Sequence, residues 1–249
     1  MAIPWGLSSS SRQIALTPLS LSCKITGKGA NDMKRAAKIV FYLIYCALGV
    51  YCILLDFGLP RVRFKWDPFV YYTSLSNMLC IGFTFLSLIW ALFSKRDFIP
   101  RVKFAFSVMI AITAIVYNLF LNKYTSAAAY FAATKNGLYH LLLPLFFCLD
   151  WLIFYDRGQV KATDPLFAAG LPLAYVVYIL VRAEVVLRIG RYVRVRYPYF
   201  FLNVDILGWD GLALWLGGLL IGVLALGYGI YALDRFLFRR KRLPLSTDK

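Results

Sequence analysis

The chain has 249 residues, of which 61% are hydrophobic and only 16% are charged. Soluble domains are about half apolar, and about a quarter of their residues are charged, so this composition excludes an ordinary soluble domain. The formal net charge is +16, but the Lys and Arg residues flank long apolar segments. That placement is typical of topology signals and of contacts with anionic membrane lipids, so we expect no nucleic-acid partner.

Six apolar segments follow one another along the chain and predict its fold class. They cover about residues 36–57, 69–93, 104–121, 137–155, 166–181 and 211–233. Most approach or exceed the roughly 20 residues that a helix needs to cross a hydrocarbon core of about 30 Å. They are continuously apolar and do not alternate with period two, which excludes a spanning barrel. We predict an all-α, multi-pass bundle of six transmembrane helices, formed as one domain by residues 34–238.

The two ends of the sequence lie outside this predicted membrane domain. The first 32 residues are Ser-rich and weakly apolar, and their longest apolar stretch is too short for the hydrophobic region of a signal peptide. Met33 then precedes Lys34, Arg35 and the first span, as at the start of many polytopic proteins. We interpret residues 1–33 as a tail that is either disordered or a misassigned start, and favour the second. Residues 239–249 form a basic tail.

The distribution of Lys and Arg predicts the orientation in the membrane. Of the 28 basic residues, 18 lie on the N-terminal side of the first span (including Lys38 in its first turn), in the second and fourth connections, or after the last span. Basic residues concentrate on the cytoplasmic side of membrane proteins. We therefore predict that both termini are cytoplasmic and that the protein resides in the cell membrane.

The cysteine and histidine content excludes several kinds of site. The five cysteines form no C-x-x-C pair, and four of them lie within predicted spans, where they indicate small packing residues. A single histidine, His140, excludes the multi-histidine sites of membrane di-metal enzymes. The sequence has no phosphate-binding loop, dinucleotide fingerprint or nucleophile elbow. We expect neither a metal nor another cofactor.

Polar residues inside apolar spans are costly, and they often mark functional sites. The second span opens with Tyr72, Thr73, Ser74 and Asn77 within its first two turns, and the fourth opens with Tyr139 and His140. With six spans, both segments enter the bilayer from the non-cytoplasmic side. At 1.5 Å per residue, the Thr73 and His140 side chains both lie roughly 5–6 Å below that surface. The shared depth predicts that helix packing brings a hydroxyl and an imidazole together.

Each of these residues also has a purely structural interpretation. A threonine in a spanning helix usually bonds its own i−4 carbonyl or a neighbouring helix. A lone interfacial histidine can simply bond a loop, and aromatic residues near span ends commonly form an interfacial belt. Asp150 lies ten residues beyond His140, which is about 15 Å along one helix. We therefore expect it either to anchor the cytoplasmic end together with Trp151 or to pair with a neighbouring Lys or Arg, and not to form a triad with His140.

Several motifs together resemble one family of six-helix membrane proteins. They are Thr-Ser-x-Ser-Asn in the second span, Tyr-His-x-x-x-Pro leading into Leu-Asp-Trp-Leu-x-Phe in the fourth, LPLAYVVYILVRAE, and YPYFFLNVDILGWDG. Over about residues 34–242 they resemble the bacterial relatives of the androgen-induced-gene and androgen-dependent TFPI-regulating proteins. The animal members are threonine hydrolases that cleave fatty acid esters of hydroxy fatty acids. By position in the pattern, the resemblance implies Thr73 as nucleophile and His140 as base.

On this interpretation the protein acts on a lipid-like substrate within the membrane. Asn77, Ser74 or Tyr139 would supply the oxyanion donor, and Tyr72 is a further candidate substrate contact. Arg residues of the connection before the last span could meet a carboxylate, or that connection could simply cap the bundle. Two other classes remain open: a non-catalytic lipid-binding or assembly protein, and a small-solute transporter. Gly218 and Gly222 form a close-packing motif that serves either within the monomer or between copies.

Overall fold

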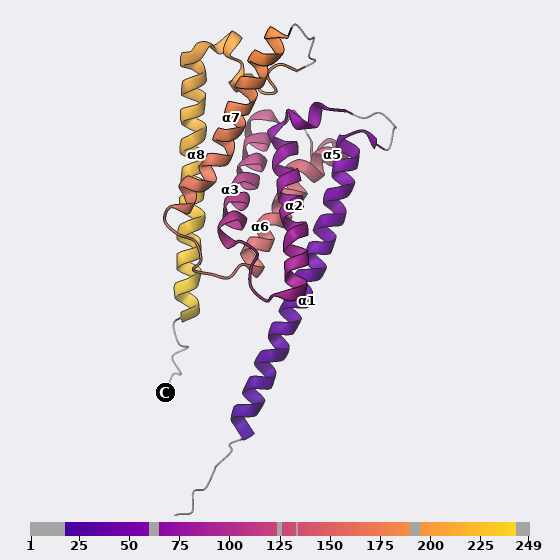
Figure 1. Cartoon of the computed structure of the whole chain (residues 1–249), viewed down its shortest axis with the longest axis vertical. Coiled ribbons are helices and arrows are strands. Elements are labelled where there is room, and N and C mark those ends of the chain that lie inside the picture. Colours follow the sequence, from indigo (N-terminus) through magenta and orange to yellow (C-terminus); the bar gives the residue numbers. More distant parts are fainter. Residues whose placement is uncertain (1–17, 60–64, 124–125, 133, 190–194, 243–249) are drawn as a thin grey trace, which may run out of the picture.

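The computed structural model describes residues 18–59, 65–123, 126–132, 134–189 and 195–242. All regular structure in these ranges is helical (Figure 1). The long helices are α1 (Pro18–Asp56), α2 (Tyr72–Phe93), α3 (Pro100–Val116), α6 (Leu143–Phe154), α7 (Asp164–Arg188) and α8 (Val204–Arg242). Short elements join them: η2 (Asp67–Phe69), η3 (Tyr117–Leu121), α4 (Ala127–Ala132), α5 (Thr134–Gly137), η4 (Leu138–Leu142) and η5 (Phe200–Leu202).

Within the described ranges, six helical stretches are long and apolar enough to cross a membrane, which confirms the predicted all-α bundle. They are Asn31–Asp56, Tyr72–Phe93, Pro100–Leu121, Lys135–Phe154, Asp164–Arg188 and Val204–Arg239. The fifth stretch, which the sequence analysis placed at only 166–181, continues to Arg188 through Pro172. The sixth stretch begins at Val204, but its backbone leaves the helical conformation at Gly208 (φ 66°, ψ 176°), so the uninterrupted helix starts close to the predicted residue 211. The fifth helix is longer than predicted because polar or charged residues at an interface interrupt the apolar pattern without ending the helix.

The bundle has two ends, which differ in the segments they carry. The terminal end carries the end of α8 and the short connections 94–99 and 155–163, and α1 enters the bundle there (Figure 1). The loop end carries the connections 57–71, 122–134 and 189–203. Helix α1 begins at Pro18, so residues 18–32 of the expected N-terminal tail are helical, while residues 1–17 lie outside the described part of the chain.

Helix α3 forms the centre of the bundle. Phe104, Ala105, Val108 and Ile110 of this helix are completely buried. Residues of α3 belong both to the apolar cluster shared with α1, α2 and α6 and to the cluster shared with α6, α7 and α8. A helix that buries side chains on several faces packs within the bundle, whereas α8 lies at its edge (Figure 1).

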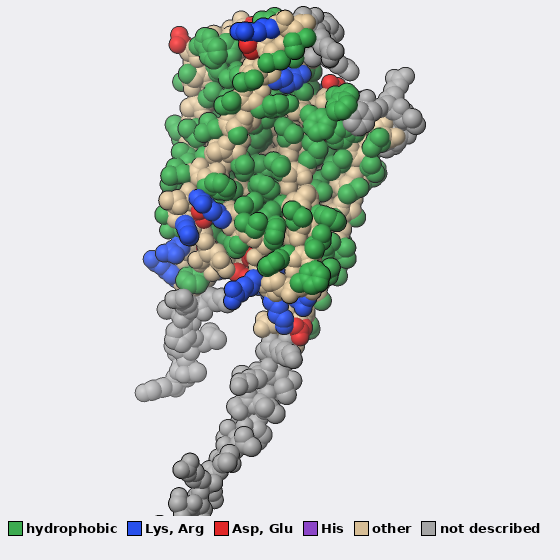
Figure 2. Space-filling view, viewed as in Figure 1, with side chains coloured by type: hydrophobic (Ala, Val, Ile, Leu, Met, Phe, Trp, Pro, Cys, Tyr) green, Lys and Arg blue, Asp and Glu red, His purple; other side chains and the backbone are tan. Residues whose placement is uncertain are grey.

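The outer surface is predominantly apolar, as a lipid-facing surface must be. Large hydrophobic side chains such as Leu214, Ile221 and Val177 are more than half exposed. Lys and Arg side chains gather at the terminal end in the view of Figure 2, with a smaller group at the loop end. This surface and the six apolar helices define an integral, multi-pass membrane protein.

Candidate functional site

Thr73 and His140 line the same cavity at the loop end of the bundle. This cavity, of about 310 Å³, lies between the start of α2, the turns η3 and η4, and the connection before η5. We call it the polar cavity. Its wall includes Thr73, Ser74, Lys135, Tyr139, His140 and Tyr199. The structure therefore brings four of the six residues proposed from the sequence to one hollow, although no hydrogen bond between Thr73 and His140 is found among the described residues.

The local backbone around His140 is set by Pro144. A proline at this position has no N–H to donate to the carbonyl of His140 four residues earlier. The chain widens into the π turn η4, in which the Leu143 N–H donates to the Leu138 carbonyl. The freed His140 carbonyl instead accepts a hydrogen bond from Nδ2 of Asn118, at 3.1 Å. Asn118 lies in η3, which is also a π turn, so two such turns meet beside the cavity. Turns of this kind occur frequently at functional sites.

The imidazole of His140 is held in one orientation and one tautomer. Its Nδ1 lies 3.1 Å from the backbone oxygen of Asn136. Because a carbonyl oxygen can only accept, Nδ1 carries the proton and Nε2 retains a lone pair. The ring of Tyr117 stacks on the imidazole with 3.3 Å between centroids, and the Tyr117 hydroxyl donates to Oδ1 of Asn136. Asn136 thus positions both the imidazole and the ring that covers it.

Thr73 is the second residue of α2, and its surroundings combine a cavity with a helix start. Tyr71 precedes the helix in an extended conformation and supplies no side-chain cap. The backbone N–H groups of the first turn consequently lack intrahelical partners. The Thr73 N–H lies 3.5 Å from the hydroxyl oxygen of Tyr199, a long and weak contact. The positive end of a helix favours negative charge at this position.

Asn77, one of the three side chains considered as oxyanion donors, ties α2 to the segment η4. Its side-chain amide donates to the backbone oxygen of Thr73 at 2.8 Å and to that of Tyr139 at 3.2 Å. The side chain is completely buried and lies outside the cavity wall. Both its amide hydrogens are therefore engaged in fixing the nucleophile candidate's helix against the segment that carries the histidine.

Ser74 is likewise engaged, and its partner Asp56 was missed by the sequence analysis. Ser74 Oγ donates to Oδ2 of Asp56 at 2.6 Å, and Lys135 forms an ion pair with Oδ1 of the same carboxylate. Asp56 is buried at the end of α1. Its position as the one acidic residue that closes the first apolar run was the available signal. The interaction holds α1, α2 and α5 together beside the cavity.

The two tyrosines proposed as substrate contacts occupy different places. Tyr139 is buried in the wall of the polar cavity, with the ammonium group of Lys135 5.9 Å from its ring centroid. Tyr72 lines instead a narrow apolar cavity of about 80 Å³, where its ring packs against Tyr175 at 4.9 Å. We call this second hollow the inner cavity. Thr73 lines both hollows.

Tyr199 is a further functional candidate that the sequence analysis did not single out. It belongs to the connection before η5 and lines both the polar and the inner cavity. Burial raises the pKa of its phenol, so the hydroxyl keeps its proton and remains a donor at neutral pH. The same connection packs over the bundle, and the arginines near it are engaged elsewhere: Arg196 of the connection pairs with Asp205, and Arg182 of α7 donates to the carbonyls of Val195 and Arg196.

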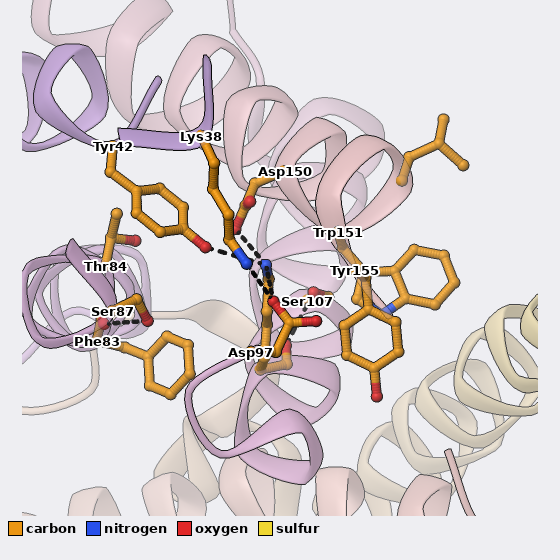
Figure 3. A network of polar contacts seen from close by, with 12 residues as sticks. Lys38, Tyr42, Phe83, Thr84, Ser87, Asp97, Ser107, Asp150, Trp151 and Tyr155 are labelled. Carbon is orange, nitrogen blue, oxygen red and sulfur yellow. Dashed lines mark hydrogen bonds and ion pairs between the residues drawn. The ribbon is translucent and has the colours of Figure 1, made fainter. Parts of the chain in front are cut away.

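A second polar cluster lies toward the terminal end of the bundle. Figure 3 shows Lys38, Asp97 and Asp150 pointing toward one another. Lys38 pairs with Asp97 at 2.5 Å, and Lys103 pairs with Asp150 at 2.9 Å and with Asp97 at 3.5 Å. Burial would raise the pKa of Asp97, but the neighbouring ammonium groups of Lys103 and Lys38 lower it below its ordinary value. The expected pairing of Asp150 with a lysine at this end is therefore confirmed.

An apolar layer separates the two polar clusters. Along α2, α3 and α6 the residues between them include Cys80, Met109, Ile110, Leu143 and Phe147, all buried in one cluster. Within the described ranges, no three His, Cys, Asp or Glu side chains form a group suited to a metal ion.

These features define a class: a multi-pass, six-helix membrane protein with a polar cavity at one end that contains a threonine and a histidine. Comparisons with protein-family models, with curated proteins and with solved structures give no match to this chain.

Proposed function

We propose that this protein is an intramembrane threonine hydrolase that cleaves esters of lipids. The observation that carries the proposal is that Thr73 and His140 line one cavity at the same end of the bundle. The sequence resemblance to the androgen-induced-gene family assigns the same two residues as nucleophile and base. The tautomer of His140 supports the assignment, because Nε2 is the nitrogen left free to accept a proton.

The reaction proceeds in two steps. His140 Nε2 takes the proton of Thr73 Oγ1 as that oxygen attacks the ester carbonyl. Collapse of the tetrahedral intermediate expels the alcohol, which receives the proton from His140, and leaves an acyl group on Thr73. A water molecule, deprotonated by His140, then attacks the acyl carbonyl; the bond to Thr73 breaks, Oγ1 recovers its proton from His140, and the fatty acid is released. Oγ1 of Thr73 must come within about 2.6–3.2 Å of Nε2, and such contacts are commonly looser before substrate binds.

The oxyanion of the intermediate requires donors that are not otherwise engaged. Asn77 and Ser74 are less suitable for this role, since their donors are directed at Thr73, Tyr139 and Asp56. The Tyr199 hydroxyl, which lines the polar cavity and keeps its proton, is the better candidate. Donors that are fixed in place before the reaction stabilise the developing charge without reorganisation.

The location of the pair suits a substrate whose acyl chains remain in the bilayer. Thr73 and His140 lie near the ends of their spans, within about 2 turns of the loop end. The excess of basic residues at the terminal end favours a cytoplasmic location for that end. The polar cavity then faces the non-cytoplasmic leaflet of the cell membrane, with both termini in the cytoplasm.

The arrangement favours hydrolysis over transport. A transporter places its substrate site near the bilayer midplane, on a path that opens to each side in turn. Here the polar cavity lies at one end, and the apolar layer of Cys80, Ile110 and Phe147 separates it from the charged cluster. A non-catalytic lipid-binding protein would use the same cavity without requiring the Thr73 hydroxyl, which is what the experiment below tests.

The test is covalent labelling of the purified protein by an alkyl fluorophosphonate, with the modified residue mapped by mass spectrometry. We expect labelling at Thr73, loss of labelling in Thr73→Ala and His140→Ala, and partial retention in Thr73→Ser. Thr84→Ala is the matched control, because Thr84 lies on the same helix but bonds the carbonyl of Cys80. Labelling of Thr73→Ala at the wild-type level, or a folded wild-type protein that does not label at all, would refute the proposal and leave the lipid-binding alternative.

A further inference from the structure

The glycines of α8 fall into two groups that differ in what surrounds them. A Cβ added at Gly227 would lie 3.1 Å from the Cβ of Pro165, so this glycine allows α7 and α8 to approach closely. Gly218 and Gly222 have nothing within 4 Å of such an atom. The interpretation of these two residues as a close-packing motif within the monomer is therefore wrong, and the space beside them needs another explanation.

Gly218 and Gly222 line a hollow of about 500 Å³ between α3, η3 and α8. We call it the outer groove. The rest of its wall is aliphatic or aromatic and includes Ile115, Phe120, Leu214 and Trp215. Ile115, Phe120 and Leu214 are exposed on the apolar outer surface. An apolar hollow at this depth favours hydrocarbon, since water there would lose its hydrogen bonds.

The outer groove leads toward Thr73. It shares Ile112, Val116 and Leu219 with the inner cavity. The inner cavity in turn shares Thr73, Tyr117, Leu121 and Tyr199 with the polar cavity. Three adjacent hollows thus extend from the lipid-facing surface, beneath α8, to both sides of the candidate nucleophile.

We propose that the outer groove and inner cavity hold an acyl chain of the substrate ester, which enters sideways from the bilayer between α3 and α8. The inference rests on the proposed function and assigns a binding site to it. The ester carbonyl reaches Thr73 where the inner and polar cavities meet, and the chain lies outward past Val116 and Gly218. Gly218 and Gly222 keep the passage open because a larger side chain at either position would fill it.

A second copy of the chain fits this site less well. A transmembrane helix is about 10–12 Å across with its side chains, so it could cover the mouth of the outer groove at Gly218 and Gly222. A helix is too wide to follow the hollows inward to Thr73, whereas a single extended hydrocarbon chain is narrow enough to do so. The inward continuation therefore favours an acyl chain over a partner helix.

The first test compares a long and a short ester in variants that fill the groove. In Gly218→Leu and Gly222→Leu we expect kcat/KM for p-nitrophenyl palmitate to fall about tenfold or more, the scale on which a few methylenes alter binding in an apolar pocket. Hydrolysis of the butyrate ester should stay near wild type. Gly217→Leu is the matched control, because Gly217 also has free space around it but does not line the groove. Equal losses for both esters, or no loss for palmitate, would overturn the inference.

A second measurement separates this inference from the proposed activity. Thr73→Ala protein in lipid nanodiscs is photolysed with a palmitate that carries a diazirine near its methyl end, and the adducts are mapped. We expect adducts on groove residues such as Ile115 and Leu214, lost in the Gly218→Leu background. Groove adducts in a protein whose wild type has no esterase activity would support the acyl-chain site and refute the proposed hydrolase. Esterase activity without groove adducts would support the hydrolase and refute the acyl-chain site. A dimer that Gly218→Leu dissociates, with no groove adducts, would identify a second copy as the occupant.

Discussion

The charged cluster at the terminal end makes a strong prediction for the variant Lys103→Met. Lys103 and Lys38 balance Asp97 and Asp150, and the side chain of Lys103 is only 1% exposed. Methionine keeps much of the apolar stem but removes the ammonium group. Lys38 is then left to serve two buried carboxylates, and the cluster acquires a net negative charge.

The expected cost follows from the burial of the cluster. Removing one partner of a buried ion pair typically costs about 3–5 kcal/mol, because a charge is left without compensation. For a chain of this size that corresponds to a fall in melting temperature of roughly 6–20 °C. Lys103→Met combined with Asp150→Asn restores neutrality and should recover much of the loss, since the Lys38–Asp97 pair remains. We expect Lys95→Met to change little, because Lys95 and Asp32 form an exposed pair worth about 0–1 kcal/mol.

The assay is the apparent melting temperature of purified protein in detergent, followed by intrinsic tryptophan fluorescence for all four proteins in parallel. We expect the melting temperature to decrease in the order wild type, Lys95→Met, the double variant and then Lys103→Met. If Lys103→Met melts within about 2 °C of Lys95→Met, or if Asp150→Asn makes Lys103→Met worse, the cluster does not stabilise the bundle in the way described.

Three other predictions concern the site, pH and topology. Tyr199→Phe should lower the rate of ester hydrolysis by about tenfold or more with little change in KM if its hydroxyl donates to the oxyanion; an unchanged kcat would exclude that role. The folded pKa of Asp97 lies below its ordinary value of 3.8, so the contribution of Asp97 to stability is present above that pH and is lost as the pH falls through the folded pKa. Between about pH 5 and about pH 3, the melting temperature of wild type should therefore fall more than that of Asp97→Asn. Parallel curves for the two proteins would contradict this. A reporter fused after Lys249 should report a cytoplasmic location, and activity seen only from a reporter that functions outside the cytoplasm would reverse the proposed orientation.

The sequence was sufficient to predict the six helices and the neighbourhood of Thr73 and His140. Apolar length alone predicts a span, and the rise per residue places two side chains at one depth without knowledge of how the helices are rotated. Helix ends were less predictable. The fifth helix continues through Arg182 and Glu184 because an interfacial residue can remain helical while its side chain bonds a loop or a neighbour, as Arg182 does with Val195.

The roles of Asn77, Ser74 and Tyr199 could not be predicted from the sequence. Whether a side chain faces a cavity or a neighbouring helix depends on the rotation of its helix about its own axis. The sequence does not specify that rotation when apolar residues lie on nearly every face of the helix. Asn77 faces the backbone of η4, and Ser74 faces Asp56, which lies 18 positions earlier in the chain. Tyr199 reaches Thr73 across a separation of 126 positions, and only tertiary packing creates that contact.

The π turn η4 has a consequence for the rotational phase of the fourth span. A π turn accommodates one residue more than an α-helical turn, and each α-helical residue advances about 100° around the axis. The turn therefore offsets the face that presents His140 to its cavity from the face that presents Asp150 to Lys103. Removing a single residue between Leu138 and Leu142 would turn one of these groups away from its partners by more than a quarter revolution. The alignment of both ends of this helix depends on one surplus residue and on Pro144, which keeps the wide turn in place.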